Sequence, residues 1–132
     1  MCGIFGFNFE DKSFCKKGLK TMTPRGPDDS GVYVDKKVTL GHNRLSIIDL
    51  SKYGKQPLSN ENETILITFN GEIYNFKELK NHLKKNHNFK SNTDTELLVH
   101  LYEEEGINML DKLQGMFAFC IYDKIKNIFF LN

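Results

Sequence analysis

The chain has 132 residues, a length that suits one domain with a substantial buried core. Lysine and arginine number 18 against 17 aspartates and glutamates, so the charge balance gives no electrostatic reason to expect nucleic acid or a membrane surface as a partner. The three cysteines, Cys2, Cys15 and Cys120, show no paired spacing. Their odd number argues against a disulfide framework and favours a reducing, cytoplasmic environment.

Apolar stretches give no sign of a membrane segment or an export signal. The longest run, residues 116–122, is far shorter than the roughly 20 residues that a membrane-spanning helix needs. Residues 1–9 are apolar but have neither the basic lead nor the small-residue cleavage site of a signal peptide.

Apolar periodicity and turn residues divide the chain into short elements. In chain order they predict a strand over 2–9, a helix over 14–22, a loop over 25–31, strands 32–34 and 38–42 paired as a hairpin, a short apolar stretch over 44–50, a strand over 64–69, helices beginning at Asn75 and Thr93, a helical stretch over 107–113, and strands 115–122 and 128–131 paired as a hairpin.

The two later helices have explicit start signals. Asn75 with Glu78, and Thr93 with Glu96, have the spacing of a capping box, and apolar residues repeat on one face after each pair. Strands, then helices, then strands again form an α+β pattern, which we assign to a single domain over residues 1–132. The last strand has no turn, cap or polar tail after Asn132, so we expect a fragment of a longer protein.

Cys2 is the first candidate for chemistry because only Met1 precedes it. Removal of Met1 would give Cys2 a free α-amine, which is a base only a few bonds from the thiol nucleophile. Such a residue is a complete nucleophilic unit that needs no separate histidine.

Arg44 lies between a strand and an apolar run, so we expect its guanidinium to be partly buried and to need an anion. A carboxylate bound at two points would suit its planar fork, and an internal salt bridge is the alternative. Asn70 and Gly71 follow a strand. They are either an ordinary turn or a pair of donors, side-chain amide and backbone N–H, for a developing oxyanion.

Asp94 falls in the first turn of the helix that Thr93 caps, where the helix dipole favours an ionised carboxylate. It is either a receptor for an ammonium group or ordinary first-turn acidity. The four histidines show no metal-ligand spacing, and there is no glycine-rich phosphate loop. We therefore assign neither metal nor nucleotide to this chain.

Taken together, several ordered motifs resemble the class II glutamine amidotransferases. They are Met1-Cys2-Gly3-Ile4-Phe5-Gly6, Arg25-Gly26-Pro27-Asp28, Arg44-Leu45-Ser46-Ile47, Asn70-Gly71-Glu72-Ile73-Tyr74-Asn75, Thr93-Asp94-Thr95-Glu96 and Leu113-Gln114-Gly115-Met116-Phe117-Ala118-Phe119. The chain has no tryptophan after Arg44, unlike other branches of the class, and this favours the glutaminase domain of glutamine-hydrolysing asparagine synthetase. That branch also contains relatives that amidate other carboxylates.

The resemblance implies a four-layer αββα N-terminal-nucleophile sandwich of antiparallel sheets, incomplete at the C-terminus. It implies that Cys2 attacks the side-chain amide of glutamine, that Asn70 and Gly71 hold the oxyanion, and that ammonia and glutamate are released. Arg44 would bind the α-carboxylate of L-glutamine and Asp94 its α-amino group. The same resemblance assigns further substrate contacts to Gly71, Glu72, Leu45, Ser46, Ile47 and Ile48.

The resemblance also sets what this chain should lack. A synthetase domain that uses ATP and Mg²⁺ to activate aspartate is absent, so the domain itself should need no cofactor. The synthetase domain of the parent chain is the expected partner, and a homodimer stays open. The alternatives are an inactive fragment that serves as a binding or pairing module, a domain that serves another carboxylate acceptor, and a different N-terminal-nucleophile hydrolase.

Overall fold

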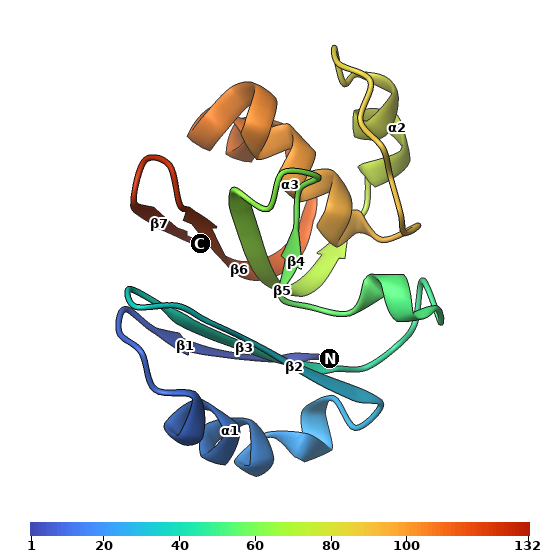
Figure 1. The fold of residues 1–132 in the computed structure, drawn as a ribbon. Helices are drawn as coiled ribbons and strands as arrows, with labels where there is room; N and C mark the ends of the chain where they lie inside the picture. The colour runs from blue at the N-terminus through green and yellow to red at the C-terminus, as the bar shows by residue number, and fades with distance from the viewer.

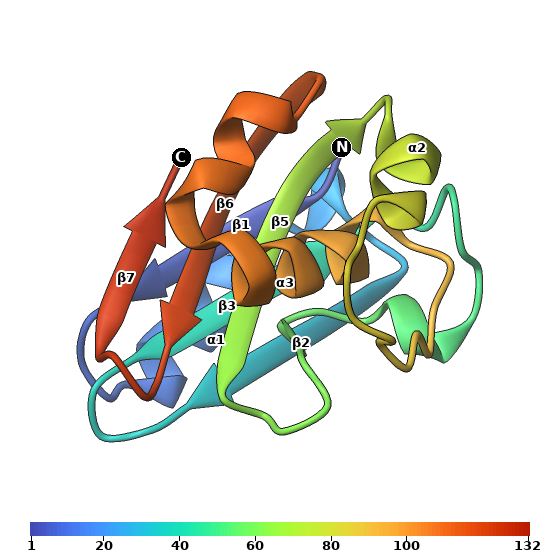
Figure 2. The same cartoon turned by 90° about the horizontal axis from the view of Figure 1, so that it is seen from above.

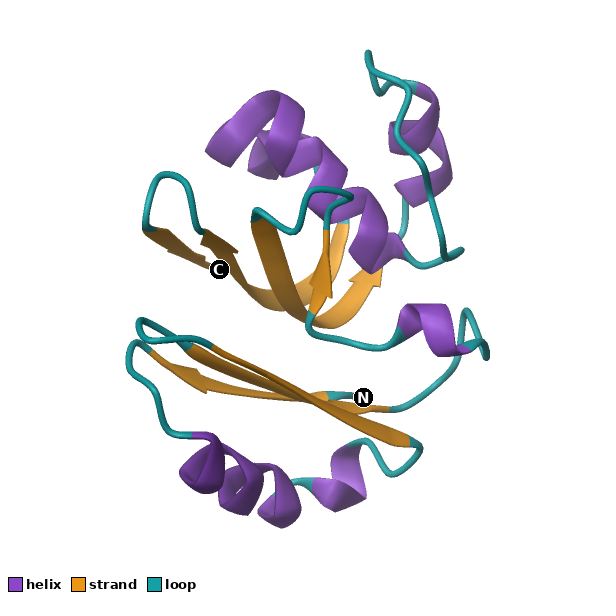
Figure 3. Cartoon of the chain, in the orientation of Figure 1, coloured by secondary structure: helices purple, strands orange, loops and turns teal.

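The computed structural model describes residues 1–132, which form two stacked antiparallel sheets with helices on both outer faces (Figures 1 and 3). The first sheet has the order β1-β3-β2, with β1 (Gly3–Phe7), β2 (Asp29–Val34) and β3 (Thr39–Arg44). The second has the order β4-β5-β6-β7, with β4 (Leu58–Ser59), β5 (Ile65–Ile73), β6 (Gly115–Asp123) and β7 (Ile128–Leu131). This arrangement confirms the predicted αββα sandwich.

The helices form the two outer layers (Figure 1). Helix α1 (Lys12–Thr21) packs on the first sheet, whereas α2 (Phe76–Asn81) and α3 (Asp94–Glu105) lie on the side of the second sheet. Seen from above, α3 crosses over β5 and β6 (Figure 2). Three short 3₁₀ helices complete the secondary structure: η1 (Thr23–Arg25), η2 (Lys52–Gly54) and η3 (Gly106–Lys112). No helix is long and apolar enough to cross a membrane.

The alternation of side chains along β5 builds both cores. Ile65 and Ile67 belong to the cluster shared with α3, whereas Leu66 packs with Val38 and Tyr122 between the sheets. Successive residues of a strand point to opposite faces, so one strand serves two apolar layers. The same inter-sheet layer contains His42, which is fully buried and whose Nε2 donates to Phe69 O at 3.1 Å.

The structure confirms both predicted hairpins and corrects several boundaries. The strand predicted over 2–9 ends at Phe7, and α1 begins at Lys12 because the Asp11 carboxylate accepts the Phe14 N–H at 2.8 Å. Strand β2 begins at Asp29, inside the predicted 25–31 loop, and the stretch 44–50 forms no strand after Arg44.

Of the two alternatives for Asn70-Gly71, the ordinary turn is wrong, because β5 continues through both residues to Ile73. The capping box predicted at Asn75 is also wrong. The Asn75 side chain instead donates to Lys112 O and accepts from Gln114 N–H, so it ties α2 to the segment before β6. At α3 the predicted cap is confirmed, since Thr93 accepts the Glu96 N–H at 3.3 Å.

Candidate active site

A cavity of about 300 Å³ lies at the N-terminus of the chain. Its walls include the two residues before β1, the end of β3 and the loop after it, the far half of β5, and the start of α3. The sequence-predicted site residues that line it are Cys2, Arg44, Leu45, Ile47, Ile48, Asn70, Gly71, Glu72 and Asp94. Ser46 does not line it, and its N–H donates to the Asp28 carboxylate at 2.7 Å.

The Cys2 thiol is half-buried at the edge of this cavity. Its Sγ accepts the Leu45 N–H at 3.4 Å and lies 3.8 Å from the Leu45 carbonyl oxygen. The Arg25 Nε–H donates to Cys2 O at 3.1 Å. The backbone of Leu45 therefore holds the sulfur, and the Arg25 side chain holds the main chain of Cys2.

Residues 25–28 connect the segment around Cys2 to the loop after Arg44. Arg25 holds Cys2, while the Asp28 N–H donates to Arg44 O at 3.0 Å and the Asp28 carboxylate holds the loop after Arg44. Gly26 passes so close to Asn43 O that a Cβ would collide with it. The motif therefore positions the catalytic candidates without itself lining the cavity.

The Arg44 guanidinium is buried, with 7% of the residue exposed. It donates to two backbone carbonyls, Ser51 O at 2.7 Å and Asp49 O. The ion pairs of the molecule do not include it, so the alternative of an internal salt bridge is wrong. The carboxylates of Asp29 and Asp49 are near enough to interact with the Arg44 charge but do not pair with it, so the side of Arg44 that faces the cavity is able to bind an anion.

Asn70 has an uncommitted amide in the cavity wall. Its Oδ1 is buried without a hydrogen-bond partner, and no side-chain hydrogen bond within the protein involves this residue. Next to it, Gly71 lies against β6 so closely that a Cβ would collide with Met116 O. The close approach keeps this part of the wall free of a side chain and exposes the backbone to the cavity.

Asp94 is almost fully buried at the first position of α3. Its Oδ2 accepts the Ile73 N–H at 3.0 Å, which fixes the carboxylate against the end of β5. Burial raises the pKa of Asp94, and the Glu72 carboxylate nearby also raises it, while the backbone N–H groups lower it. A cationic group in the cavity would relieve the cost of this buried charge.

The cavity also contains residues that sequence reasoning missed, among them Asp49 and Gln56. Gln56 accepts the Phe69 N–H at 2.6 Å and donates to Thr95 Oγ1 at 3.2 Å, so it joins the loop before β4 to both β5 and α3. Backbone N–H donors lower the pKa of Asp49, chiefly that of Asn92. No local pattern marked these residues, because Gln56 acts through Phe69 and Thr95 and the Asp49 carboxylate also accepts the N–H of the distant Asn92.

The whole chain, residues 1–132, matches the protein family described as "Glutamine amidotransferase domain". The chain therefore belongs to this family, as its motifs indicated. It is 52% identical over 139 residues to asparagine synthetase 2 (glutamine-hydrolyzing) of Bacillus subtilis, covering 99% of this chain and 18% of that protein. It is 41% identical to the Escherichia coli asparagine synthetase B (glutamine-hydrolyzing), covering 100% of this chain and 25% of that protein.

A further relative is the putative asparagine synthetase 1 (glutamine-hydrolyzing) of Methanocaldococcus jannaschii, 40% identical over 97% of this chain and 27% of that protein. The chain thus spans about a quarter or less of these relatives. The solved structure of the B. subtilis glutamine PRPP amidotransferase shares the fold, with a TM-score of 0.76 and 23% identity over 94% of this chain and 35% of that one.

Proposed function

We propose that the cavity is a glutaminase site in which the Cys2 thiol attacks the side-chain amide carbon of L-glutamine. The observation that carries this proposal is the lining of one cavity by a half-buried thiol, a buried guanidinium without an ion pair, an uncommitted amide and a buried carboxylate. Glutamine offers a matching group for each, namely an amide carbon, a carboxylate, a carbonyl oxygen and an ammonium.

In the proposed reaction, Met1 is first removed, so that the α-amine of Cys2 becomes available as a base. The amine takes the thiol proton, directly or through a water molecule, and the sulfur forms a bond to the amide carbon. Asn70 and the Gly71 N–H stabilise the oxyanion of the tetrahedral intermediate. The protonated amine then gives its proton to the leaving nitrogen, ammonia departs, and water hydrolyses the thioester to glutamate.

Recognition of the substrate backbone is assigned to the charged residues of the same cavity. Arg44 binds the α-carboxylate, and Asp94 binds the α-ammonium with help from Gly71 and Glu72. Backbone groups of residues 45–48 complete the wall, although Ser46 would contribute only through the course of its backbone. This recognition rejects amides that lack the α-carboxylate or the α-ammonium, because the buried Arg44 or Asp94 would then be left without its partner.

We further propose that the ammonia serves a synthetase domain of the parent chain, which uses ATP and Mg²⁺ to activate aspartate. The support is the identity to glutamine-hydrolysing asparagine synthetases over nearly the whole of this chain. The glutaminase step itself should need no cofactor, since thiol, amine and oxyanion donors complete the chemistry.

The test is release of glutamate and ammonia from glutamine by the wild-type protein and by Cys2→Ala, with intact mass measured to establish removal of Met1. Cys120→Ala is the matched control, because Cys120 lies outside the cavity and burial raises the pKa of its thiol to about 11. We expect activity in the wild type and the control only. Equal rates with Cys2→Ala would contradict the proposal, and a retained Met1 with no activity would favour the inactive binding module.

A further inference from the structure

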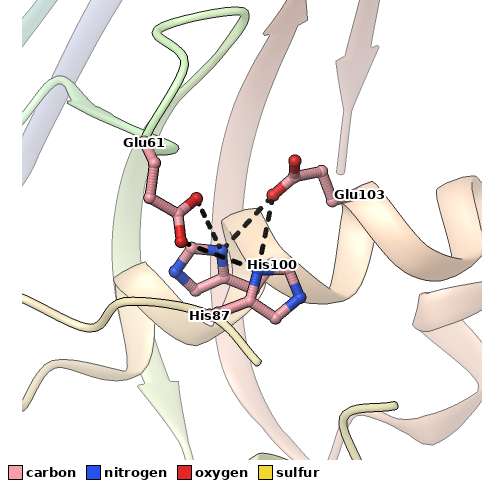
Figure 4. Close-up of side chains that lie close together, drawn as sticks. All are labelled: Glu61, His87, His100 and Glu103. Carbon is pink, nitrogen blue, oxygen red and sulfur yellow. Dashed lines mark hydrogen bonds and ion pairs between the residues drawn. The ribbon is translucent and has the colours of Figure 1, made fainter. Parts of the chain in front are cut away.

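Four side chains that the glutaminase site does not use meet at the far part of α3 (Figure 4). Glu61 comes from the loop between β4 and β5, His87 from the segment between α2 and α3, and His100 and Glu103 from α3 itself. Their nearest ligand atoms all lie within 4.8 Å of one another. Figure 4 shows both carboxylates directed at the ring nitrogens of the two histidines.

The distances suit a four-coordinate metal ion. The His87 Nδ1 lies 3.8 Å from a Glu61 oxygen and 3.8 Å from a Glu103 oxygen, and the His100 Nδ1 lies 3.7 Å and 3.4 Å from oxygens of the same two residues. Around tetrahedral Zn²⁺, ligands at about 2.0–2.1 Å from the metal are about 3.3–3.4 Å apart. The planes of the His87 and His100 rings differ by 28°. Small side-chain shifts and a further tilt of these two rings would bring the four ligand atoms to the distances of a tetrahedral site.

The Glu104 carboxylate, which is not one of the four candidate ligands, already orients the His87 ring. The His87 Nε2 lies 3.0 Å from the Glu104 carboxylate, which is itself fixed by the N–H groups of Lys84 and Lys85 at 2.9 and 2.8 Å. When the Nε2–H donates to this carboxylate, the Nδ1 lone pair points at the cluster. Carboxylate–histidine pairs of this kind accompany histidine ligands in zinc sites.

Burial and charge favour a divalent cation at this place. The side chains of His87 and His100 are 6% and 1% exposed, and their rings stack at 4.2 Å, so two protonated rings would repel each other. Two neutral imidazoles and two carboxylates carry a charge of −2, which one Zn²⁺ neutralises. The side chains of Glu61 and Glu103 are 29% and 24% exposed, which leaves an entry path from solvent.

We propose that Glu61, His87, His100 and Glu103 form a structural zinc site. The ion would join three segments of the chain. The segment that contains His87 runs on to Thr93, which caps the helix that carries Asp94. It would take no part in the chemistry at Cys2, because none of its ligands lines the cavity and His100 stands about 9 Å of helix rise beyond Asp94. The inference does not depend on the proposed glutaminase activity.

The test is titration of chelator-treated wild-type protein with Co²⁺, followed by displacement with Zn²⁺. We expect saturation at one equivalent, the intense visible bands of tetrahedral Co²⁺, and no thiolate-to-metal band, which excludes the three cysteines as ligands. Glu61→Gln and Glu103→Gln should weaken Zn²⁺ binding at least as strongly as Glu104→Gln, for which loss of the second shell predicts about 10–100-fold. Glu63→Gln, on the same loop as Glu61 but outside the cluster, is the matched control.

A measurement on the unmodified protein covers the case in which a variant fails to fold. Added Zn²⁺ should shift the ring signals of His87 and His100 in NMR spectra, whereas those of His42 and His82 should stay in place. No saturable binding, binding that survives in both ligand variants, a thiolate band, or shifts at the other two histidines would each overturn the proposal.

Discussion

Arg44 shows how a single buried charge prepares a substrate site. Its guanidinium is oriented by the carbonyls of Ser51 and Asp49, and no carboxylate of the protein lies within ion-pair distance of it. Carbonyl oxygens fix the planar fork but do not neutralise it. Although Asp29 and Asp49 interact with its charge from a greater distance, the fork remains able to bind an anion on the cavity side, and the α-carboxylate of a free amino acid would supply one.

Replacement of Arg44 by lysine tests this role. Lysine keeps the charge but cannot form two parallel bonds to a carboxylate, so a charged hydrogen bond worth about 1.5–3 kcal/mol should be lost. We expect kcat/KM for glutamine to fall about 10–100-fold, mostly through KM. Slow hydrolysis of a simple amide without an α-carboxylate is the internal control and should change little. An equal loss for both amides would show that the substitution disturbs the whole site.

The ionised Asp94 carboxylate should lower the stability of the fold while it provides the binding site for the α-ammonium of glutamine. Burial raises its pKa, so the folded state binds a proton more readily than the unfolded state. The ionised carboxylate therefore weakens the fold at neutral pH, and this penalty disappears as the pH falls below the unfolded pKa near ~3.9.

Asp94→Asn should then abolish glutamine hydrolysis while leaving the free energy of unfolding at pH 7 unchanged or higher, because asparagine can still accept the Ile73 N–H. The measurement is urea unfolding of both proteins between pH 7 and pH 4. The advantage of the variant should shrink towards acid pH. A marked loss of stability in Asp94→Asn at pH 7 would contradict this account of the buried carboxylate.

At the scale of elements, the course of β5 decides where the oxyanion donors lie. The strand does not turn at Asn70-Gly71 but continues along β6 as far as the pair Ile73–Gly115. Pairing over this length requires β5 and β6 to approach closely at Gly71, where a Cβ would meet Met116 O. The glycine is thus required by strand packing, not by a turn.

Gly71→Ala should separate the two strands at the cavity. We expect a loss of about 1–3 kcal/mol in the free energy of unfolding, the usual cost of overpacking, together with loss of glutamine hydrolysis. Thermal and urea unfolding would measure the first effect. Glu72→Ala, at the next and exposed position of the same strand, is the control for stability and should change it little. Equal stability of both variants would argue against the close approach.

At the scale of the whole molecule, His42 joins the two sheets from within. It is fully buried in β3 and bonded to Phe69 O of β5, and burial lowers its pKa to about 4. The unfolded chain would bind a proton at His42 near pH ~6.5, whereas the folded chain would not until about pH 4. Stability should therefore fall as the pH drops through this window, by up to roughly 3 kcal/mol in total.

His42→Gln can keep a donor to Phe69 O but has no titrating ring. We expect its free energy of unfolding to depend less steeply on pH between about 6.5 and 4 than that of the wild type. The difference in slope should correspond to the uptake of up to one proton on unfolding. Urea unfolding across this pH range measures the slope. His82→Gln, at an exposed position, should behave as the wild type. Identical slopes in all three proteins would exclude His42 as the source of acid sensitivity.

The sequence by itself determined the class of fold, both hairpins and the cap of α3 by Thr93. These features depend on local chemistry or on motifs shared with relatives. Every predicted site residue except Ser46 lines the cavity, whereas Asp49 and Gln56 of the same lining were missed. The sequence misjudged the end of β5 and the cap at Asn75, because pairing with β6 and a bond to Lys112 outweighed the local preference.

Only the tertiary structure decided which polar groups have partners. It placed carbonyls instead of a carboxylate at Arg44, brought Gln56 to Phe69, and gathered Glu61 and His100 from segments about forty residues apart. The physical reason is that the energy of a buried charge or amide depends on what surrounds it in space, and those neighbours come from distant parts of the chain.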